Sequence, residues 1–219
     1  MLENLKREVI KAAQDGQRLD LCKHKSGNFS IRDKETGYVV VTPSGVNREE
    51  LTVDDICVLT VDGELIEVKN GRRPSSETMM HLEVYKARGD IMAIVHTHSK
   101  MATSFAVLNK PIPAIIYEVA TFGLKDAVVP VAPYARPGTV ELAKSVIEPV
   151  KRADIFLLEK HGVVACGTDM YEAFLRAQYV EELAEVYYYT LLINKGNEPA
   201  SFSPEELERW KYPEKLEKK

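Results

Sequence analysis

Cysteine is scarce in this 219-residue sequence, and no two cysteines form a CxxC pair. Cys22, Cys57 and Cys166 are odd in number and far apart, a pattern of reduced thiols rather than of a disulfide framework. An excess of positive charge is also lacking, because 29 Lys and Arg residues stand against 33 Asp and Glu residues, for a formal net charge of −4. This balance argues against a nucleic-acid partner, whose binding face is rich in basic residues.

Long apolar runs are absent as well. The longest ones fall far short of the roughly 20 residues that a membrane helix needs, so no membrane partner is expected. The first residues, MLENLKREVIKAAQ, carry charges at every turn and lack the apolar region of a secretory signal, which predicts a cytoplasmic protein. Neither a Walker-type run nor GxGxxG is present, so a nucleotide phosphate is not indicated.

The sequence does contain a regular alternation of element types, and 45% hydrophobic residues suffice for a buried core. Helical periodicity predicts helices at 2–19, 77–87, 99–108, 138–150 and 169–194. Short β-rich runs predict strands at 38–41, 56–61, 65–68, 91–98, 112–116, 128–131 and 155–158. Early hairpins and interleaved helices predict an α/β fold, a mixed sheet with helices on both faces.

Nothing along the chain resembles a linker, so residues 1–212 are expected to form one domain. Ser203 followed by Pro and two acids predicts a last short helix that ends near Tyr212. Residues 213–219 form a charged tail that we expect to be disordered.

The most informative stretch is the apolar run that ends in His96-Thr97-His98. Side chains two residues apart in a strand share a face, so these two imidazoles can converge on one ion. His161 ends another apolar run, and Gly162 is expected to let the chain turn sharply after it. Glu77 offers a carboxylate at the start of a predicted helix. Three imidazoles and one displaceable carboxylate are typical of an open, catalytic zinc site.

Two other histidines have weaker claims. His81 lies one helical turn after Glu77 and shares its face, so it competes for the third imidazole position. His24 lies in a basic loop with no partner by spacing, and we interpret it as structural or exposed.

Three short polar turns are found near these elements: Ser26-Gly27-Asn28, Thr42-Pro43-Ser44-Gly45 and Pro74-Ser75-Ser76. Each offers hydroxyl, amide or backbone N–H donors, and the third precedes a helix, whose N-terminus attracts anions. Taken singly, each is adequately explained as a turn or a helix cap. Together, beside a metal site, they suit the phosphate of a small sugar.

Five motifs appear in the order seen in the class II aldolase/adducin family: Gly27-Asn28-Phe29-Ser30, Thr42-Pro43-Ser44-Gly45, Pro74-Ser75-Ser76-Glu77, His96-Thr97-His98 and His161-Gly162. The chain resembles this family from about Leu2 to Tyr212. The resemblance implies a three-layer α/β/α fold with a mixed, largely antiparallel central sheet. It also implies a homotetramer with active sites at the subunit interfaces and one Zn²⁺ per subunit.

The resemblance assigns roles to single positions. His96, His98 and His161 would hold Zn²⁺ together with Glu77, which would also transfer a proton once substrate displaces it. The positions that would bind phosphate are Gly27, Asn28, Ser44, Gly45, Ser75 and Ser76.

Aromatic residues are implied as well. Tyr117 matches a tyrosine that reaches a neighbouring subunit's site, and Tyr212 matches a second, mobile tyrosine. Trp210 stands where the family has an aromatic that lines the aldehyde pocket. Pro137 falls where related enzymes carry another aromatic, so the aldehyde partner is the least determined part of the resemblance.

The implied activity is retro-aldol cleavage of a phosphorylated ketose, most like the branch that splits L-fuculose 1-phosphate into dihydroxyacetone phosphate and L-lactaldehyde. The second candidate activity is that of the 4-epimerases of L-ribulose 5-phosphate. That branch resembles this chain but has Ser-Ser-Asp where this chain has Ser75-Ser76-Glu77. A related sugar-phosphate aldolase or dehydratase ranks third. A non-catalytic interaction head, as in adducin, is the interpretation from a different class, but such heads lack the metal ligands that this sequence retains.

Overall fold

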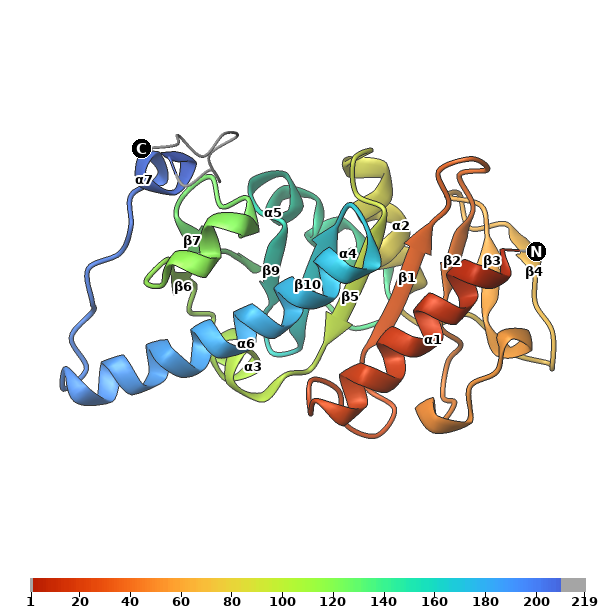
Figure 1. The fold of residues 1–219 in the computed structure, drawn as a ribbon, viewed down its shortest axis with the longest axis horizontal. Coiled ribbons are helices and arrows are strands. Elements are labelled where there is room, and N and C mark those ends of the chain that lie inside the picture. Colours follow the sequence, from red (N-terminus) through yellow and green to blue (C-terminus); the bar gives the residue numbers. More distant parts are fainter. Residues whose placement is uncertain (1, 210–219) are drawn as a thin grey trace, which may run out of the picture.

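The computed structural model describes residues 2–209, and its framework is an eight-stranded sheet in the order β4-β3-β2-β1-β5-β10-β9-β8 (Figure 1). These strands are β1 (Asn28–Arg32), β2 (Val39–Val41), β3 (Cys57–Leu59), β4 (Leu65–Glu67), β5 (Ala93–Thr97), β8 (Val131–Ala132), β9 (Ile155–Leu158) and β10 (Gly162–Gly167). Neighbouring strands pair antiparallel except β8 and β9, which are parallel. The expected mixed, largely antiparallel sheet is confirmed.

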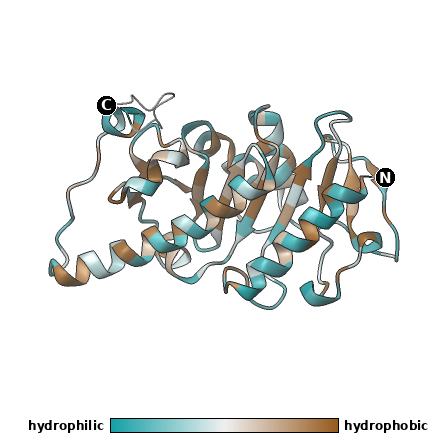
Figure 2. Cartoon of the chain, in the orientation of Figure 1, coloured by the Kyte–Doolittle hydropathy of each residue, from teal (hydrophilic) through white to brown (hydrophobic). Residues whose placement is uncertain are grey.

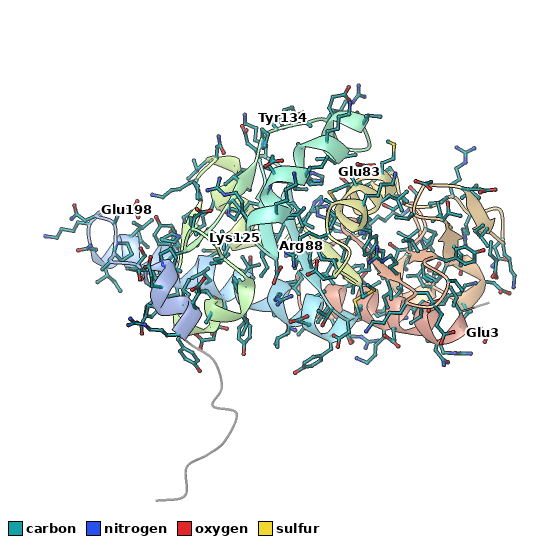
Figure 3. All side chains as sticks on the ribbon, turned by 90° about the horizontal axis from the view of Figure 1, so that it is seen from above. Glu3, Glu83, Arg88, Lys125, Tyr134 and Glu198 are labelled. Carbon is teal, nitrogen blue, oxygen red and sulfur yellow. The ribbon has the colours of Figure 1, made fainter. Side chains whose placement is uncertain are left out.

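Helices cover both faces of the sheet. One face carries α1 (Glu3–Arg18), α3 (Lys100–Val107) and α6 (Met170–Ile193), and the other carries α2 (Thr78–Ala87), α4 (Val140–Ser145) and α5 (Ile147–Arg152). Figure 1 shows α1 and α6 crossing the same face, and in Figure 3 Glu3 of α1 and Glu83 of α2 lie on opposite sides. The three-layer α/β/α arrangement is therefore confirmed.

The layers follow from the strand sequences. In β9, Ile155 and Leu157 pack into the core beneath α1, α3 and α6, whereas Phe156 and Leu158 pack against α2, α4 and α5. Successive side chains of a strand point to opposite faces, so a strand buried on both faces is a continuous apolar run. Figure 2 shows this as hydrophobic colour on the central strands between more polar outer helix surfaces.

Smaller elements complete the described chain. A two-stranded sheet joins β6 (Ile112–Pro113) and β7 (Val128–Val129), and short 3₁₀ helices are η1 (Arg48–Glu50), η2 (Val53–Asp55) and η3 (Tyr117–Phe122). The last helix, α7, spans Pro204–Arg209. Trp210, Tyr212 and the charged tail lie outside the described residues, as does the predicted end of this helix.

Several elements differ from the sequence expectations, and proline explains two of the differences. The predicted helix at 138–150 is divided into α4 and α5, because Pro149 has no N–H to donate to Ser145 four residues earlier. The predicted strand at 128–131 is divided by Pro130, so β7 pairs with β6 while β8 pairs with β9. Strands β1 and β10, both central in the sheet, were not predicted.

The short connection between the antiparallel strands β3 and β4 contains Asp62-Gly63. Cys22, Cys57 and Cys166 are all free and buried, as expected for reduced thiols. No helix among residues 2–209 has the length and apolar character to cross a membrane.

Candidate metal centre and active site

The ends of two paired strands bring the three predicted histidines together. His96 lies in β5, His98 follows that strand, and His161 precedes β10, the antiparallel neighbour of β5. The ring centroids lie 4.8 Å (His96 to His161) and 4.9 Å (His98 to each of the others) apart. Glu77, the residue before α2, places Oε2 3.2 Å from His96 Nε2 and Oε1 3.1 Å from His161 Nε2. One ligand atom from each of the four lies within 4.8 Å of the others.

The hydrogen bonds of this cluster suit a cation. His96 Nδ1 lies 2.8 Å from the carbonyl oxygen of Val163, which can only accept, so Nδ1 carries the proton and Nε2 is free to act as a ligand. Among the described residues, the buried atoms Glu77 Oε1 and His161 Nδ1 have no hydrogen-bond partner. Buried polar atoms are rarely left unsatisfied, and a coordinated ion would satisfy the carboxylate oxygen. The donor set fits an open, three-histidine metal site with an additional carboxylate.

Burial and neighbouring groups together favour the protonation states that a metal would require. Burial, together with the nearby His96, lowers the pKa of His98 to about 3 and that of His161 to about 4. Burial opposes ionisation of Glu77, but His96, His161 and the Asn28 amide outweigh it and hold the pKa of this carboxyl well below its usual range. Near neutral pH the site therefore presents a carboxylate and neutral imidazoles at positions 98 and 161.

A buried polar network supports the carboxylate from the side of α2. Asn28 Nδ2 donates to Glu77 Oε2 at 2.8 Å, and His81 Nε2 lies 2.5 Å from Asn28 Oδ1. Because Oδ1 only accepts, His81 Nε2 is the donor, so Nδ1 accepts from Ser30 Oγ at 2.6 Å and Ser30 accepts from Tyr85 at 2.8 Å. Burial lowers the pKa of His81 to about 3, which keeps this ring neutral.

This network decides between the two candidates for the third imidazole by position. His81 lies outside the cluster that could hold a metal and bonds to Asn28, whereas His161 lies inside it. His24, interpreted as structural or exposed, is exposed.

Gly162 is required for a reason other than the predicted turn. Its φ is not positive, and the turn after β9 instead uses Lys160, with φ 55°. A Cβ at position 162 would lie 2.3 Å from the backbone oxygen of Thr97 and 3.1 Å and 3.3 Å from ring carbons of His98 and His96. Glycine therefore permits close packing of β10 on the histidine-bearing end of β5.

The three polar turns meet beside the cluster. A cavity of about 290 Å³ is lined by Lys25, Ser26, Gly27, Asn28, Pro43, Ser44, Gly45, Ser75, Ser76, Glu77, His98, Pro137 and His161. Backbone bonds tie two turns together, since Ser44 N donates to Arg73 O at 2.9 Å and Ser75 N donates to Thr42 O at 3.1 Å. All six predicted phosphate-binding positions thus line one cavity together with Glu77, His98 and His161.

Residues 7–188 match the family model described as Class II Aldolase and Adducin N-terminal domain. The chain belongs to the class II aldolase and adducin family. It is 36% identical to a 5-deoxy-D-ribulose 1-phosphate aldolase of Bacillus thuringiensis serovar kurstaki, covering 95% of this chain and 94% of that protein. It is 36% identical to the L-fuculose phosphate aldolase of Escherichia coli K12, covering 86% and 85%. A solved L-fuculose 1-phosphate aldolase superposes with a TM-score of 0.87 at 36% identity, covering 94% and 93%.

Membership in this family, with curated aldolases among its relatives, confirms that the chain is an enzyme of the carbon–carbon lyase type. Class II aldolases depend on a metal, and Glu77, His96, His98 and His161 form a group that could hold one. The interpretation as a non-catalytic interaction head is therefore wrong.

Tyr117 is the implied aromatic that the described residues include, and it does not line the cavity beside the cluster. Tyr117, in η3, is 54% exposed and lines a separate small pocket beside α7 with Ala120, Phe202, Glu206 and Leu207. None of these residues lines the cavity that contains Glu77. Pro137 does line that cavity, whereas Trp210 and Tyr212 lie outside the described residues.

Sequence reasoning missed the support of the site. Ser30, Tyr85 and the pairing of Asn28 with His81 were not predicted, although Asn28 and Ser30 alternate with Phe29 and Ile31 in the period of a strand. That alternation was the signal that could have identified both β1 and its polar face.

Proposed function

We propose that this chain cleaves L-fuculose 1-phosphate, or a closely related ketose 1-phosphate, to dihydroxyacetone phosphate and an aldehyde, which is L-lactaldehyde for L-fuculose 1-phosphate. The observation that carries the proposal is the junction of three imidazoles and Glu77 with a cavity lined by Ser and Gly turns. A retro-aldol cleavage of a sugar phosphate needs both parts: a site that stabilises negative charge on the ketose oxygens, and an anchor for the phosphate.

In this proposal Glu77, His96, His98 and His161 hold one Zn²⁺ per subunit. When bound there, the ion supplies Lewis-acid stabilisation of the negative charge that develops on the ketose oxygens during C3–C4 cleavage. The protein's own contribution begins with orientation. Gly27, Ser44, Gly45, Ser75 and Ser76 bind the phosphate and so hold the sugar chain across the cavity, which lowers the entropic cost of reaction.

Glu77 moves the proton at C3. Substrate binding would free the Glu77 carboxylate from the cluster, and the carboxylate oxygens would then be available to C3 of the sugar. The Asn28 amide still donates its hydrogen bond to Glu77 Oε2, so the freed carboxylate stays in place instead of rotating to solvent. After cleavage, Glu77 delivers a proton to C3 and completes dihydroxyacetone phosphate.

Tyr117 supplies the other proton transfer, from a neighbouring subunit. The C4 hydroxyl loses its proton as the aldehyde forms, and a phenol at the site's edge suits this step. Tyr117 is half exposed and lines a different pocket from Glu77 of its own chain. A position away from its own Glu77 fits the proposal that Tyr117 completes the site of an adjacent subunit in a homotetramer. Tyr212, which lies outside the described residues, is proposed for the same site.

A second ketose has specific support. The relative that covers 95% of this chain is named a 5-deoxy-D-ribulose 1-phosphate aldolase. The same C3–C4 cleavage of that five-carbon substrate releases acetaldehyde in place of L-lactaldehyde. Both substrates place a methyl group at the aldehyde end and a phosphate at the other end, so the cluster and the turns serve either one.

The test is to incubate the metal-loaded protein in parallel with L-fuculose 1-phosphate, 5-deoxy-D-ribulose 1-phosphate and L-ribulose 5-phosphate. Dihydroxyacetone phosphate is followed by coupled reduction to glycerol 3-phosphate, and the Glu77→Gln variant is the control. We expect triose phosphate from the first or the second ketose. Conversion of L-ribulose 5-phosphate to D-xylulose 5-phosphate without triose phosphate would identify an epimerase and overturn the proposal.

A further inference from the structure

Three cationic side chains of the described chain are almost fully buried, and they are paired differently. Lys6 lies 2.8 Å from Glu67 Oε1, and Arg176 lies 3.1 Å from Asp154 and 2.8 Å from Glu172. Arg48 is only 3% exposed, yet within residues 2–209 no carboxylate lies at ion-pair distance from it. A buried charge without a counter-ion is costly, which calls for another source of compensation.

Arg48 bonds to backbone instead of to an acid. Its Nη2 donates to the carbonyl oxygen of Ser26 at 2.9 Å and to that of Gly27, and the guanidinium carbon lies 5.5 Å from the centre of the Phe29 ring. Its Nε is buried and has no hydrogen-bond partner in the described part of the chain. Burial lowers the pKa of Arg48, the direction expected when a cation leaves water.

The two carbonyls belong to a turn that faces the candidate active site. Ser26 and Gly27 line the 290 Å³ cavity together with Ser44, Ser75 and Ser76. The positive charge of Arg48 therefore lies directly behind one wall of the cavity, with a single turn of backbone between them. Screening by water is weak behind that wall, so an anion in the cavity interacts with the charge more strongly than it would with an exposed lysine.

We propose that Arg48 is a positioning residue for phosphate: its hydrogen bonds hold the Ser26-Gly27 turn against the cavity, and its buried charge stabilises the phosphate anion bound there. This inference rests on the proposed function in taking the ligand to be a phosphate ester. The bound anion is the counter-ion that Arg48 lacks among residues 2–209.

Two substitutions separate charge from shape. Arg48→Met removes the charge and keeps an unbranched side chain, whereas Arg48→Lys keeps the charge but cannot reproduce the guanidinium geometry. Arg18→Met is the matched control, because it removes the same charge from an exposed arginine that pairs with Asp15 on α1. Inorganic phosphate is the probe, and its dissociation constant is measured by calorimetry on the metal-loaded protein at pH 7.5 and low salt.

We expect Arg48→Met to weaken phosphate binding about tenfold, Arg48→Lys to weaken it less than about threefold, and Arg18→Met to leave it unchanged. With a ketose 1-phosphate that is cleaved, Arg48→Met raises KM while kcat changes little. Unchanged phosphate binding by a folded Arg48→Met variant would overturn the inference. Equal losses in Arg48→Met and Arg48→Lys would overturn the role of charge.

A measurement on the unmodified protein covers the case in which Arg48→Met does not fold. The Nε–H of Arg48 is buried and gives a protected ¹⁵N resonance, assigned by its loss in Arg48→Lys. We expect added phosphate to shift this resonance and to leave that of Arg176 in place; equal response of the two would contradict the inference. Phosphate binding needs no turnover, so failure of all three ketoses to react would refute the proposed function while leaving this result intact.

Discussion

The ligand cluster and the polar turns share one cavity, but the fold holds them in opposite ways. Glu77 is 7% exposed and His96 is fully buried, whereas Ser44, Gly45 and Ser76 are exposed. The first group lies on strand ends and at a helix start, with hydrogen bonds to Asn28 and to backbone. The turns are joined to one another by a few backbone bonds. The cluster is therefore buried and hydrogen-bonded, whereas residues of the turns line the same cavity from exposed positions.

The difference predicts that changes in the cluster abolish chemistry or metal binding, while changes in the turns weaken substrate binding.

The strongest test is Glu77→Gln. Glutamine preserves the shape and can still accept from Asn28, so we expect the fold to survive and kcat to fall on the order of 10³-fold, within the range of general acid–base catalysis. Coupled assay of triose phosphate measures the loss, with circular dichroism as the check on folding. Undiminished turnover to triose phosphate would remove Glu77 from its role.

His161→Ala tests the metal side of the comparison. Loss of one of three imidazoles is expected to weaken metal affinity by more than the roughly 10–100-fold that follows from losing a supporting hydrogen bond. Metal content after gel filtration in chelator-treated buffer measures the effect. His24→Ala, which removes an exposed histidine, is the control and should retain its metal. Equal metal content in the two variants would show that position 161 is not a ligand.

Ser76→Ala tests the turns. Its hydroxyl lines the cavity from an exposed position, so its removal is expected to cost one hydrogen bond to phosphate and to raise KM roughly tenfold with little change in kcat. Steady-state kinetics with the cleaved ketose 1-phosphate separate the two parameters. A large fall in kcat at unchanged KM would erase the distinction between cluster and turns.

The smallest expected effect is on stability against pH. The pKa of His81 is about 3 in the folded chain and about 6.5 when unfolded, so unfolding takes up a proton between these values and is favoured as pH falls below about 6.5. Each such proton contributes a slope of about 1.4 kcal/mol per pH unit. We expect His81→Gln to lower the pH dependence of the unfolding free energy by about 1.4 kcal/mol per pH unit, the contribution of one proton. Urea unfolding of the chelated protein at pH 6.5, 5.5 and 4.5 measures it, and identical slopes would contradict the network described here.

Much of this site could be predicted from the sequence because its chemistry depends on local spacing. His96 and His98 share a strand face by the period of two, and Glu77 precedes a helix that the apolar pattern identifies. The predicted phosphate positions line one cavity because backbone bonds join their turns.

What escaped prediction depends on long-range pairing. β1 alternates polar and apolar residues, which suggests a solvent-exposed face, yet Asn28 and Ser30 are buried against α2. These polar side chains can be buried because His81 and Tyr85 of α2 form hydrogen bonds with them. The pairing of Arg48 with carbonyls about 20 residues earlier escapes for the same reason.

The close contact at Gly162 sets how near β10 lies to the histidine-bearing end of β5. Any methyl group added there collides with the Thr97 carbonyl, and the collision can be relieved only by separating the strand that bears His161 from the strand that bears His96. A side chain at position 162 is therefore expected to disturb the geometry of the three imidazoles, although glycine itself offers no ligand atom.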